Sequence, residues 1–187
     1  MSVSAQTQAQ TPPDANWAQG FPPIENPTAR VLILGSMPGI ASLRAVQYYA
    51  HPRNQFWPIL GALLDRDLVA LAYPERVRCL VDAGIALWDV LQSCQRPGSL
   101  DADIAPDSII TNDFASFFAY HPAITHVFFN GATAEQQFKQ RVQARIALPQ
   151  LHTQRLPSTS PAHAALTFPA KLKDWRAVAE VLDEVLE

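Results

Sequence analysis

The segment QYYAHPRNQFW, residues 47–57, gathers polar groups and aromatic rings in a mixture that a core strand or an ordinary loop would not carry. The ring of Tyr49 could offer a flat face on which a nucleobase stacks. The amide of Asn54 both donates and accepts hydrogen bonds, so it could hold a water molecule against a substrate. Arg53 could bind a phosphate. The segment therefore indicates a site where a base, a phosphate and an ordered water could meet.

A purely structural role for the same residues is open as well. The aromatic side chains could all belong to the core, and we expect this of Phe56 and Trp57. His51 and Asn54 could instead cap a helix that begins near residue 54, because Asn is a preferred N-cap residue. For Asn54 both interpretations stand at this stage.

The segment GSMPG, residues 35–39, directly follows an apolar run. Gly35 and Gly39 would let the backbone come close to a ligand, and Pro38 would fix the turn. Taken alone, the segment favours a tight turn from a strand to a helix. It lacks G-K-[ST] and the G-x-G-x-x-G spacing, which excludes a P-loop and a dinucleotide-binding fingerprint.

The segment PSTSPAH, residues 157–163, places small residues between two prolines and predicts a rigid, narrow loop. Such a loop could hold a DNA phosphate through the hydroxyl groups of Ser158 and Ser160. Taken alone, the same residues favour a Ser/Thr turn that leads into the last helix.

Other combinations of chemically active residues are absent from the sequence. There is no G-x-S-x-G segment and no H-x-x-x-H pair. Cys79 and Cys94 form no C-x-x-C pair, so we expect neither a zinc site nor a disulfide framework. His121 and His126 flank a turn at the opposite end of the expected sheet, and we expect solvated surface histidines there.

The apolar runs that must position these residues predict four buried parallel strands, at 30–35, 84–90, 125–131 and 152–157. The last run is the weakest, because its apolar content is low. Helical patterns cover 54–65, 74–83, 112–122, 133–146 and 171–187. Strand alternating with helix predicts an α/β fold, a three-layer α/β/α sandwich around a short four-stranded parallel sheet.

Sites in parallel sheets lie at the carboxyl ends of the strands. The segments that follow the predicted strands, and that therefore matter most, are 35–42, 89–101, 130–134 and 157–163. GSMPG and PSTSPAH lie in two of them, and the aromatic segment begins about ten residues after the first.

The chain has 187 residues, of which 48% are hydrophobic and 17% charged, which is typical of one globular domain. We expect that domain over 17–187 and a flexible tail over 1–16, which is rich in Gln, Thr and Pro. No apolar run has the length of a membrane span, and the N-terminus has no signal-peptide pattern, so we expect a cytoplasmic protein. The net charge of −3 excludes a protein coated in positive charge but permits a local strip that binds a few phosphates.

Together, GSMPG, YAHPRNQFW, FFNG and STSPA at this spacing resemble the uracil-DNA glycosylase superfamily, above all its mismatch-specific and hypoxanthine-DNA (deoxyinosine) glycosylase branches. The resemblance covers residues 29 to 175. Mismatch-specific members have G-x-N-P-G in the first motif, where the Asn positions the attacking water. Met37 stands at that position here, and the resemblance to the hypoxanthine branch implies that Asn54 takes the catalytic role.

The resemblance also implies roles for the other residues. Tyr49 falls where an aromatic ring stacks on the flipped base. Asp89 falls where relatives read the base edge with an amide, and a carboxylate there would accept from hypoxanthine N1–H or uracil N3–H. Ser158 stands where His or Asn usually leads the second motif, so strong stabilisation of the leaving group by a histidine is not expected.

We therefore expect a monofunctional DNA repair glycosylase that hydrolyses the N-glycosidic bond of hypoxanthine or uracil and leaves an abasic site. Backbone N–H groups of Gly35, Ser36 and Met37, beside Pro38, would bind the base. Residues for DNA binding would be Arg53, Ser158, Ser160, Ala162 and His163, the last two filling the emptied stack. We expect damaged DNA as the partner, no metal or organic cofactor, no membrane association, and a monomer.

Two alternatives remain. One is a hydrolase of free nucleosides on a similar sheet. The other is a module that binds damaged DNA without catalysis, which the replacement by Met37 and the negative net charge leave open.

Overall fold

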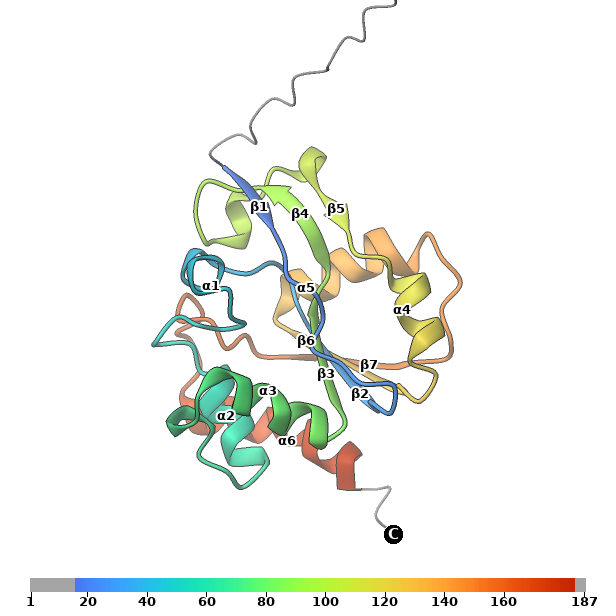
Figure 1. Cartoon of the computed structure of the whole chain (residues 1–187). Helices are drawn as coiled ribbons and strands as arrows, with labels where there is room; N and C mark the ends of the chain where they lie inside the picture. Colours follow the sequence, from blue (N-terminus) through green and yellow to red (C-terminus); the bar gives the residue numbers. More distant parts are fainter. Residues whose placement is uncertain (1–15, 184–187) are drawn as a thin grey trace, which may run out of the picture.

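The computed structural model describes residues 16–183, and its centre is a four-stranded parallel sheet in the order β3-β2-β6-β7 (Figure 1). The strands are β2 (Val31–Gly35), β3 (Ile85–Asp89), β6 (His126–Asn130) and β7 (His152–Leu156). Each matches a predicted run. The strand β7 pairs only with β6 and is exposed over most of its length, which explains its low apolar content.

Alternate residues of the central strand β2 face opposite sides of the sheet and enter two separate cores. Leu32 and Leu34 belong to one apolar cluster, and Val31 and Ile33 belong to the other. Because a parallel sheet of this kind is covered on both faces, every residue of β2 is buried.

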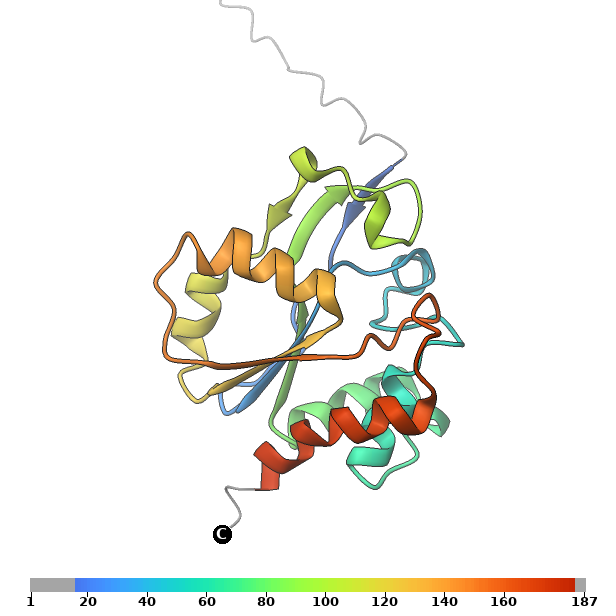
Figure 2. The ribbon, with the colours of Figure 1, turned by 180° about the vertical axis from the view of Figure 1, so that it is seen from behind.

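Helices cover both faces, so the predicted three-layer sandwich is confirmed (Figures 1 and 2). One layer contains α2 (Phe56–Leu63), α3 (Tyr73–Asp82) and α6 (Phe168–Asp183). The other contains α4 (Phe114–Tyr120) and α5 (Ala132–Gln137), which continues as the π-helical η4 (Phe138–Gln143). The flexible tail expected over 1–16 lies outside the described residues except for its last position.

Local sequence explains where two of these helices begin. Glu75 accepts a hydrogen bond from the Ala72 N–H through Oε2 at 3.1 Å, ahead of α3. Asp113 accepts from the Ser116 N–H at 3.1 Å and caps α4. Both helices were predicted to within two residues at each end.

A second, antiparallel sheet was not predicted. It contains β1 (Trp17–Gln19), β4 (Leu91–Gln95) and β5 (Ile110–Thr111) in the order β1-β4-β5, and lies beyond the carboxyl end of β3 (Figure 1). The remaining elements are α1 (Ile40–Ala45) and the short 3₁₀ helices η1 (Leu68–Ala70), η2 (Asp101–Asp103) and η3 (Pro106–Ser108). The segment 89–101, named above only as one that follows a predicted strand, therefore contains the strand β4.

His121 is not a solvated surface residue, so that prediction is wrong. Its ring is 5% exposed and stacks on Phe117 at 4.3 Å between centroids. Its Nδ1 lies 2.7 Å from the Phe117 carbonyl oxygen, and its Nε2 lies 3.0 Å from a Glu25 carboxylate oxygen. The histidine is buried because both ring nitrogens have partners that replace water.

Candidate functional site

A cavity of about 390 Å³ opens at the carboxyl ends of all four parallel strands. After β2 the chain continues to α2 and α3 on one face of the sheet, and after β6 it continues to α5 on the other. The neighbouring strands β2 and β6 therefore form a topological switch point, the usual position of a ligand site in such sheets.

All but one of the expected site residues line this cavity. They are Gly35, Ser36, Met37, Pro38, Tyr49, Asn54, Asp89, Ser158, Ser160, Ala162 and His163. Arg53 is exposed and does not line the cavity, although it is the residue next to Asn54.

Tyr49 is held in a fixed position on the cavity wall. Its backbone is in the left-handed region, with φ 54°, and its ring stacks on Phe56 at 4.0 Å between centroids. Its hydroxyl is buried beside Asp89 and the amide of Asn130, without a well-formed hydrogen bond to any described residue. The ring is half-buried, so it can present a flat surface to the cavity.

The neighbouring aromatic residues are structural. Phe56 and Trp57 are buried, as predicted, and the Trp57 Nε1–H donates to the Tyr48 carbonyl oxygen at 3.0 Å. Tyr48 is 3% exposed and its hydroxyl donates to the Pro22 carbonyl oxygen at 3.0 Å. Of the two adjacent tyrosines, only Tyr49 is arranged for binding.

Asn54 supports the start of α2, but from the position before the N-cap residue, which is Gln55 and not Asn54 as one of its two interpretations had it. Its Oδ1 accepts a hydrogen bond from the Phe56 N–H at 2.9 Å, at the first residue of α2. An amide oxygen has a second lone pair, and the Nδ2 group makes no hydrogen bond within residues 16–183. The side chain can therefore support the start of the helix and hold a water molecule at the same time.

Asp89 is a nearly buried carboxyl group, 4% exposed, opposite Gly35 in the register of β2 and β3. A Cβ atom on Gly35 would overlap the Asp89 carboxyl and lie 2.9 Å from the Tyr49 hydroxyl. Glycine is required here because the carboxyl group occupies the space of a side chain. Burial raises the pKa of Asp89 to about 7; the negative charge of Asp101 adds to the rise and Arg96 opposes it.

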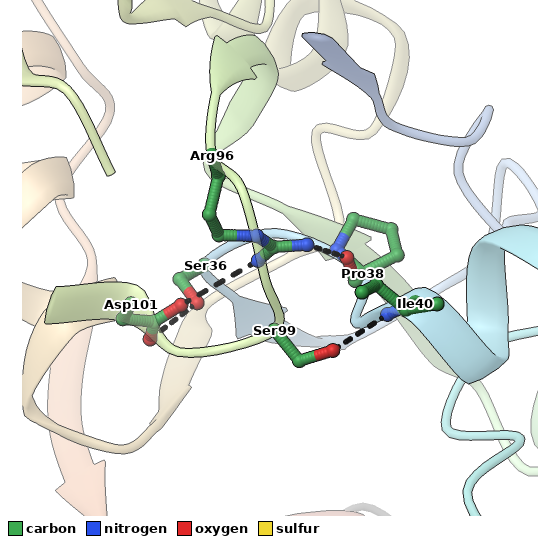
Figure 3. Close-up of polar contacts among 6 residues, drawn as sticks. All are labelled: Ser36, Pro38, Ile40, Arg96, Ser99 and Asp101. Carbon is green, nitrogen blue, oxygen red and sulfur yellow. Dashed lines mark hydrogen bonds and ion pairs between the residues drawn. The ribbon is translucent and has the colours of Figure 1, made fainter. Parts of the chain in front are cut away.

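The segment after β4 holds the GSMPG turn from its outer side (Figure 3). Ser36 donates a hydrogen bond through Oγ to Asp101 Oδ2 at 2.7 Å, and Ser99 Oγ accepts from the Ile40 N–H at 2.9 Å. Arg96, whose side chain is fully buried, donates to the Pro38 carbonyl oxygen and lies 3.9 Å from Asp101 Oδ1. The segment 96–101, which follows the strand β4 of the second sheet, therefore fixes the turn that borders the cavity.

Met37 has no polar function in this turn. Its side chain is 6% exposed and packs into the apolar cluster that includes Leu34. Only the backbone of this position can offer a hydrogen bond to a ligand.

An amide at the end of β6 fixes the loop that follows β7. Asn130 donates through Nδ2 to Thr159 Oγ1 and accepts through Oδ1 from the Thr159 N–H, both at 2.9 Å. The Thr159 carbonyl oxygen also accepts from the Gln55 N–H at 3.0 Å. One threonine therefore joins this loop to β6 and to the start of α2.

The serine hydroxyls of the same loop form the expected turns. Ser158 Oγ accepts from the Ser160 N–H and Ser160 Oγ accepts from the Ala162 N–H, both at 3.2 Å. Lys171, which is buried, donates through Nζ to the His163 carbonyl oxygen at 2.8 Å. These hydrogen bonds hold the loop in its turns, and its serine residues line the cavity.

Sequence reasoning missed five polar residues at this site, namely Arg96, Ser99, Asp101, Asn130 and Thr159. A signal was available for them, because they lie in or beside the segments that follow predicted strands. Within residues 16–183 no cluster of His, Cys, Asp or Glu could hold a metal ion. None of the helices in that range is both long and apolar enough to cross a bilayer.

A profile of the Uracil DNA glycosylase superfamily matches residues 22–182. The chain belongs to this superfamily. The match covers the parallel sheet, the strands β4 and β5 of the second sheet and the whole cavity wall, so the resemblance seen in the motifs is confirmed and the protein is a DNA glycosylase by family.

Individual proteins that are similar to this chain are also named as DNA glycosylases. The chain is 41% identical over 113 residues to the hypoxanthine DNA glycosylase of Methanosarcina barkeri strain Fusaro, covering 60% of this chain and 70% of the relative. It is 36% identical over 116 residues to that of Methanosarcina acetivorans, covering 62% and 72%. A solution NMR structure of a candidate uracil DNA glycosylase from Methanosarcina acetivorans has a TM-score of 0.75 at 31% identity, covering 89% of this chain and 99% of that chain.

Proposed function

We propose that this protein excises a deaminated base, hypoxanthine or uracil, from DNA by hydrolysing its N-glycosidic bond, and that it leaves an abasic site. The observation that carries the proposal is one cavity lined by the Tyr49 ring, the Asn54 amide and the Asp89 carboxyl. The relatives named as hypoxanthine DNA glycosylases favour hypoxanthine as the principal substrate.

The target atom is hidden inside a duplex, so the nucleotide must first be extruded, at a cost of about a few kcal/mol. Stacking on Tyr49 offsets part of that cost. Extrusion of a mispaired hypoxanthine or uracil costs less free energy than extrusion of a paired normal base. This difference contributes selectivity before any chemistry occurs.

Bond cleavage makes the sugar oxocarbenium-like and places negative charge on the departing base. The backbone N–H groups of the turn at Gly35, Ser36 and Met37 stabilise that charge. A water held by the Asn54 amide attacks the sugar carbon as the base leaves.

The proposed enzyme is monofunctional, because no lysine is among the described residues that line the cavity. The amine of Lys171 is directed to the His163 carbonyl oxygen instead. A Schiff base with the sugar, which strand cleavage by a glycosylase requires, has no nucleophile here.

The rim of the cavity binds the DNA backbone. Ser158 and Ser160 border the cavity from the loop after β7, and the exposed Arg53 directly precedes Asn54, which also lines the cavity. Ala162 and His163, at the end of that loop, fill the space left by the extruded base. Such an enzyme needs no metal or organic cofactor and would act on DNA in the cytoplasm.

The test uses duplex oligonucleotides that carry one hypoxanthine, uracil or xanthine, and an undamaged duplex. After incubation with the protein, alkali cleaves any abasic site. We expect cleavage at hypoxanthine or uracil only after alkali, and none in the undamaged duplex. Cleavage of free inosine alone would identify a nucleoside hydrolase, and tight binding without base release would identify a non-catalytic module.

A further inference from the structure

The carboxyl group of Asp89 is unusual because it lines the cavity and one of its oxygens has no hydrogen-bond donor among the described residues. Its Oδ2 is buried without a hydrogen bond to any described residue. Gly35, opposite it, contributes no side chain, and the hydroxyl of Tyr49 next to it makes no well-formed hydrogen bond. A buried carboxylate in such surroundings is costly, whereas a neutral carboxylic acid is not.

A second carboxyl group nearby has the partners that Asp89 lacks. Burial raises the pKa of Asp101 as well, but three contacts oppose that rise. Asp101 accepts from the Ser36 hydroxyl, it faces Arg96 at 3.9 Å, and a hydrogen bond from Thr133 also favours its ionised form. Two neighbouring carboxyl groups in a site of low dielectric do not both ionise readily. The negative charge therefore belongs on Asp101 and the proton on Asp89.

The other groups around Asp89 do not change this assignment. Tyr48 and Tyr49 are buried and their pKa values are raised by burial, so neither carries charge at neutral pH. Arg96 opposes protonation of Asp89, but its guanidinium hydrogen-bonds Pro38 and pairs with Asp101. His51 and His163 line the same cavity and are the remaining titratable groups there.

On the basis of the proposed function, we infer that Asp89 reads the extruded base as an uncharged carboxylic acid. Its carbonyl oxygen accepts a hydrogen bond from the ring N–H, and its hydroxyl donates to the adjacent ring carbonyl. Hypoxanthine presents this pair as N1–H and O6, and uracil presents it as N3–H and a flanking oxygen. A neutral acid matches both atoms, as the side-chain amide of an asparagine would, whereas a carboxylate would repel the ring carbonyl.

A neutral Asp89 cannot distinguish hypoxanthine from every normal base. A neutral acid can exchange its donor and acceptor oxygens, so it can match N1 and the amino group of adenine as well. Rejection of undamaged adenine therefore depends on the cost of extruding a base from a stable pair. Asp89 selects for a base with a donor and an acceptor side by side, and it loses that ability when it ionises.

The experiment measures the single-turnover rate of hypoxanthine release from a duplex between pH 5 and 9, for the wild type and for Asp89→Asn. Because the pKa of Asp89 is about 7, we expect the wild-type rate to fall as pH rises above 7, by about tenfold per pH unit. Asparagine presents the same donor and acceptor at every pH. We expect Asp89→Asn to keep the rate at pH 6 within about fivefold and to lose the alkaline fall.

Two results would overturn the inference. One is an alkaline fall that persists in Asp89→Asn, which would assign it to His51, His163 or another group. The other is a loss of about 100-fold or more in Asp89→Asn at pH 6, where the matched amide should suffice. Absence of base release from the wild type at every pH would instead contradict the proposed function.

Asp101→Asn provides a matched control. Removal of that negative charge lowers the pKa of Asp89, so the alkaline fall should move to lower pH while remaining present. A carbon-13 NMR titration of labelled aspartate follows the protonation of Asp89 directly and does not depend on enzyme activity. A signal that titrates near pH 7 and vanishes in Asp89→Asn supports the inference, and a titration near pH 4 would contradict it.

Discussion

At the scale of single residues, Asn54 is the clearest case of one side chain with two tasks. Its amide oxygen accepts from the Phe56 N–H at the start of α2, and the same side chain lines the cavity. A test of its chemistry must therefore separate a damaged helix start from a lost water site.

We predict that Asn54→Ala and Asn54→Ser both lose base release by about 100-fold or more, because neither can hold the attacking water. A serine hydroxyl can still accept from the Phe56 N–H, so only Asn54→Ala should lose about 1 kcal/mol of unfolding free energy. Single-turnover kinetics and urea denaturation measure the two effects. Normal turnover by Asn54→Ser would show that Asn54 has only a structural role at the start of α2.

A second prediction concerns the glycines of the GSMPG turn. Gly35→Ala should destabilise the protein by about 1–3 kcal/mol and impair base release, because its Cβ overlaps the Asp89 carboxyl. Gly39→Ala is the matched control, since its Cβ would meet only Ser99 atoms at 3.5 and 3.6 Å. If thermal unfolding shows equal losses for the two variants, the packing at Gly35 is not the cause.

The buried Asp89 also predicts how stability depends on pH. Its pKa is about 7 in the folded protein and 3.8 in the unfolded chain, so the folded state binds the proton more tightly. Its contribution to stability is complete below pH 4 and is lost as pH rises to 7, by up to about 4 kcal/mol. Asp89→Asn should remove this loss. Denaturation curves at pH 5 and pH 8 test it, and an identical pH dependence in both proteins would contradict it.

At the scale of elements, two hydrogen bonds between Asn130 at the end of β6 and Thr159 in the loop after β7 shape the cavity. Thr159→Val removes the acceptor of the Asn130 amide while keeping the shape of the buried side chain. We expect a loss of about 1 kcal/mol in stability, because the half-buried Asn130 amide is left without that partner. Binding of an abasic duplex should weaken as the loop loosens. Thr159→Ser keeps the hydroxyl and should behave like the wild type in both measurements.

The main sheet and its helices could be predicted because their signals are local. The runs before Gly35 and Asn130 are continuously apolar, as strands buried on both faces must be. The first motif could likewise be placed at a strand end, where a parallel sheet puts its ligand site.

The second sheet could not be predicted, because its strands are short and their partners are distant in sequence. β5 has only two residues and pairs with β4. β1 also pairs with β4, which follows it more than 70 residues later in the sequence. For the same reason the contacts of Arg96 and Asp101 with the GSMPG turn were missed. They depend on a chain path that folds back about 60 residues later.

At the scale of the whole molecule, the net charge of −3 constrains how the protein can hold DNA. Attraction has to come from the local rim around Arg53 and the loop after β7, and not from an overall positive field. We predict that the logarithm of affinity for an abasic duplex falls with the logarithm of salt concentration with a slope of roughly −2 to −4. A slope near −10 would indicate a larger DNA surface than this rim.

The oligomeric state is a further prediction at this scale. The cavity is lined by segments of one chain, so no second copy is needed to complete it. We expect a monomer of 20.6 kDa in light scattering, with activity proportional to protein concentration. A stable dimer whose activity falls on dilution would show that the site needs a partner.

The proposed function requires that an extruded base occupies the cavity at the carboxyl ends of β2 and β6. The most direct test is a crystal structure of Asn54→Ala bound to a duplex with one hypoxanthine. We predict that the hypoxanthine lies in the cavity, in stacking contact with the Tyr49 ring and within hydrogen-bond distance of Asp89. A hypoxanthine that remains stacked in the duplex, or that is extruded to another surface, would contradict the account.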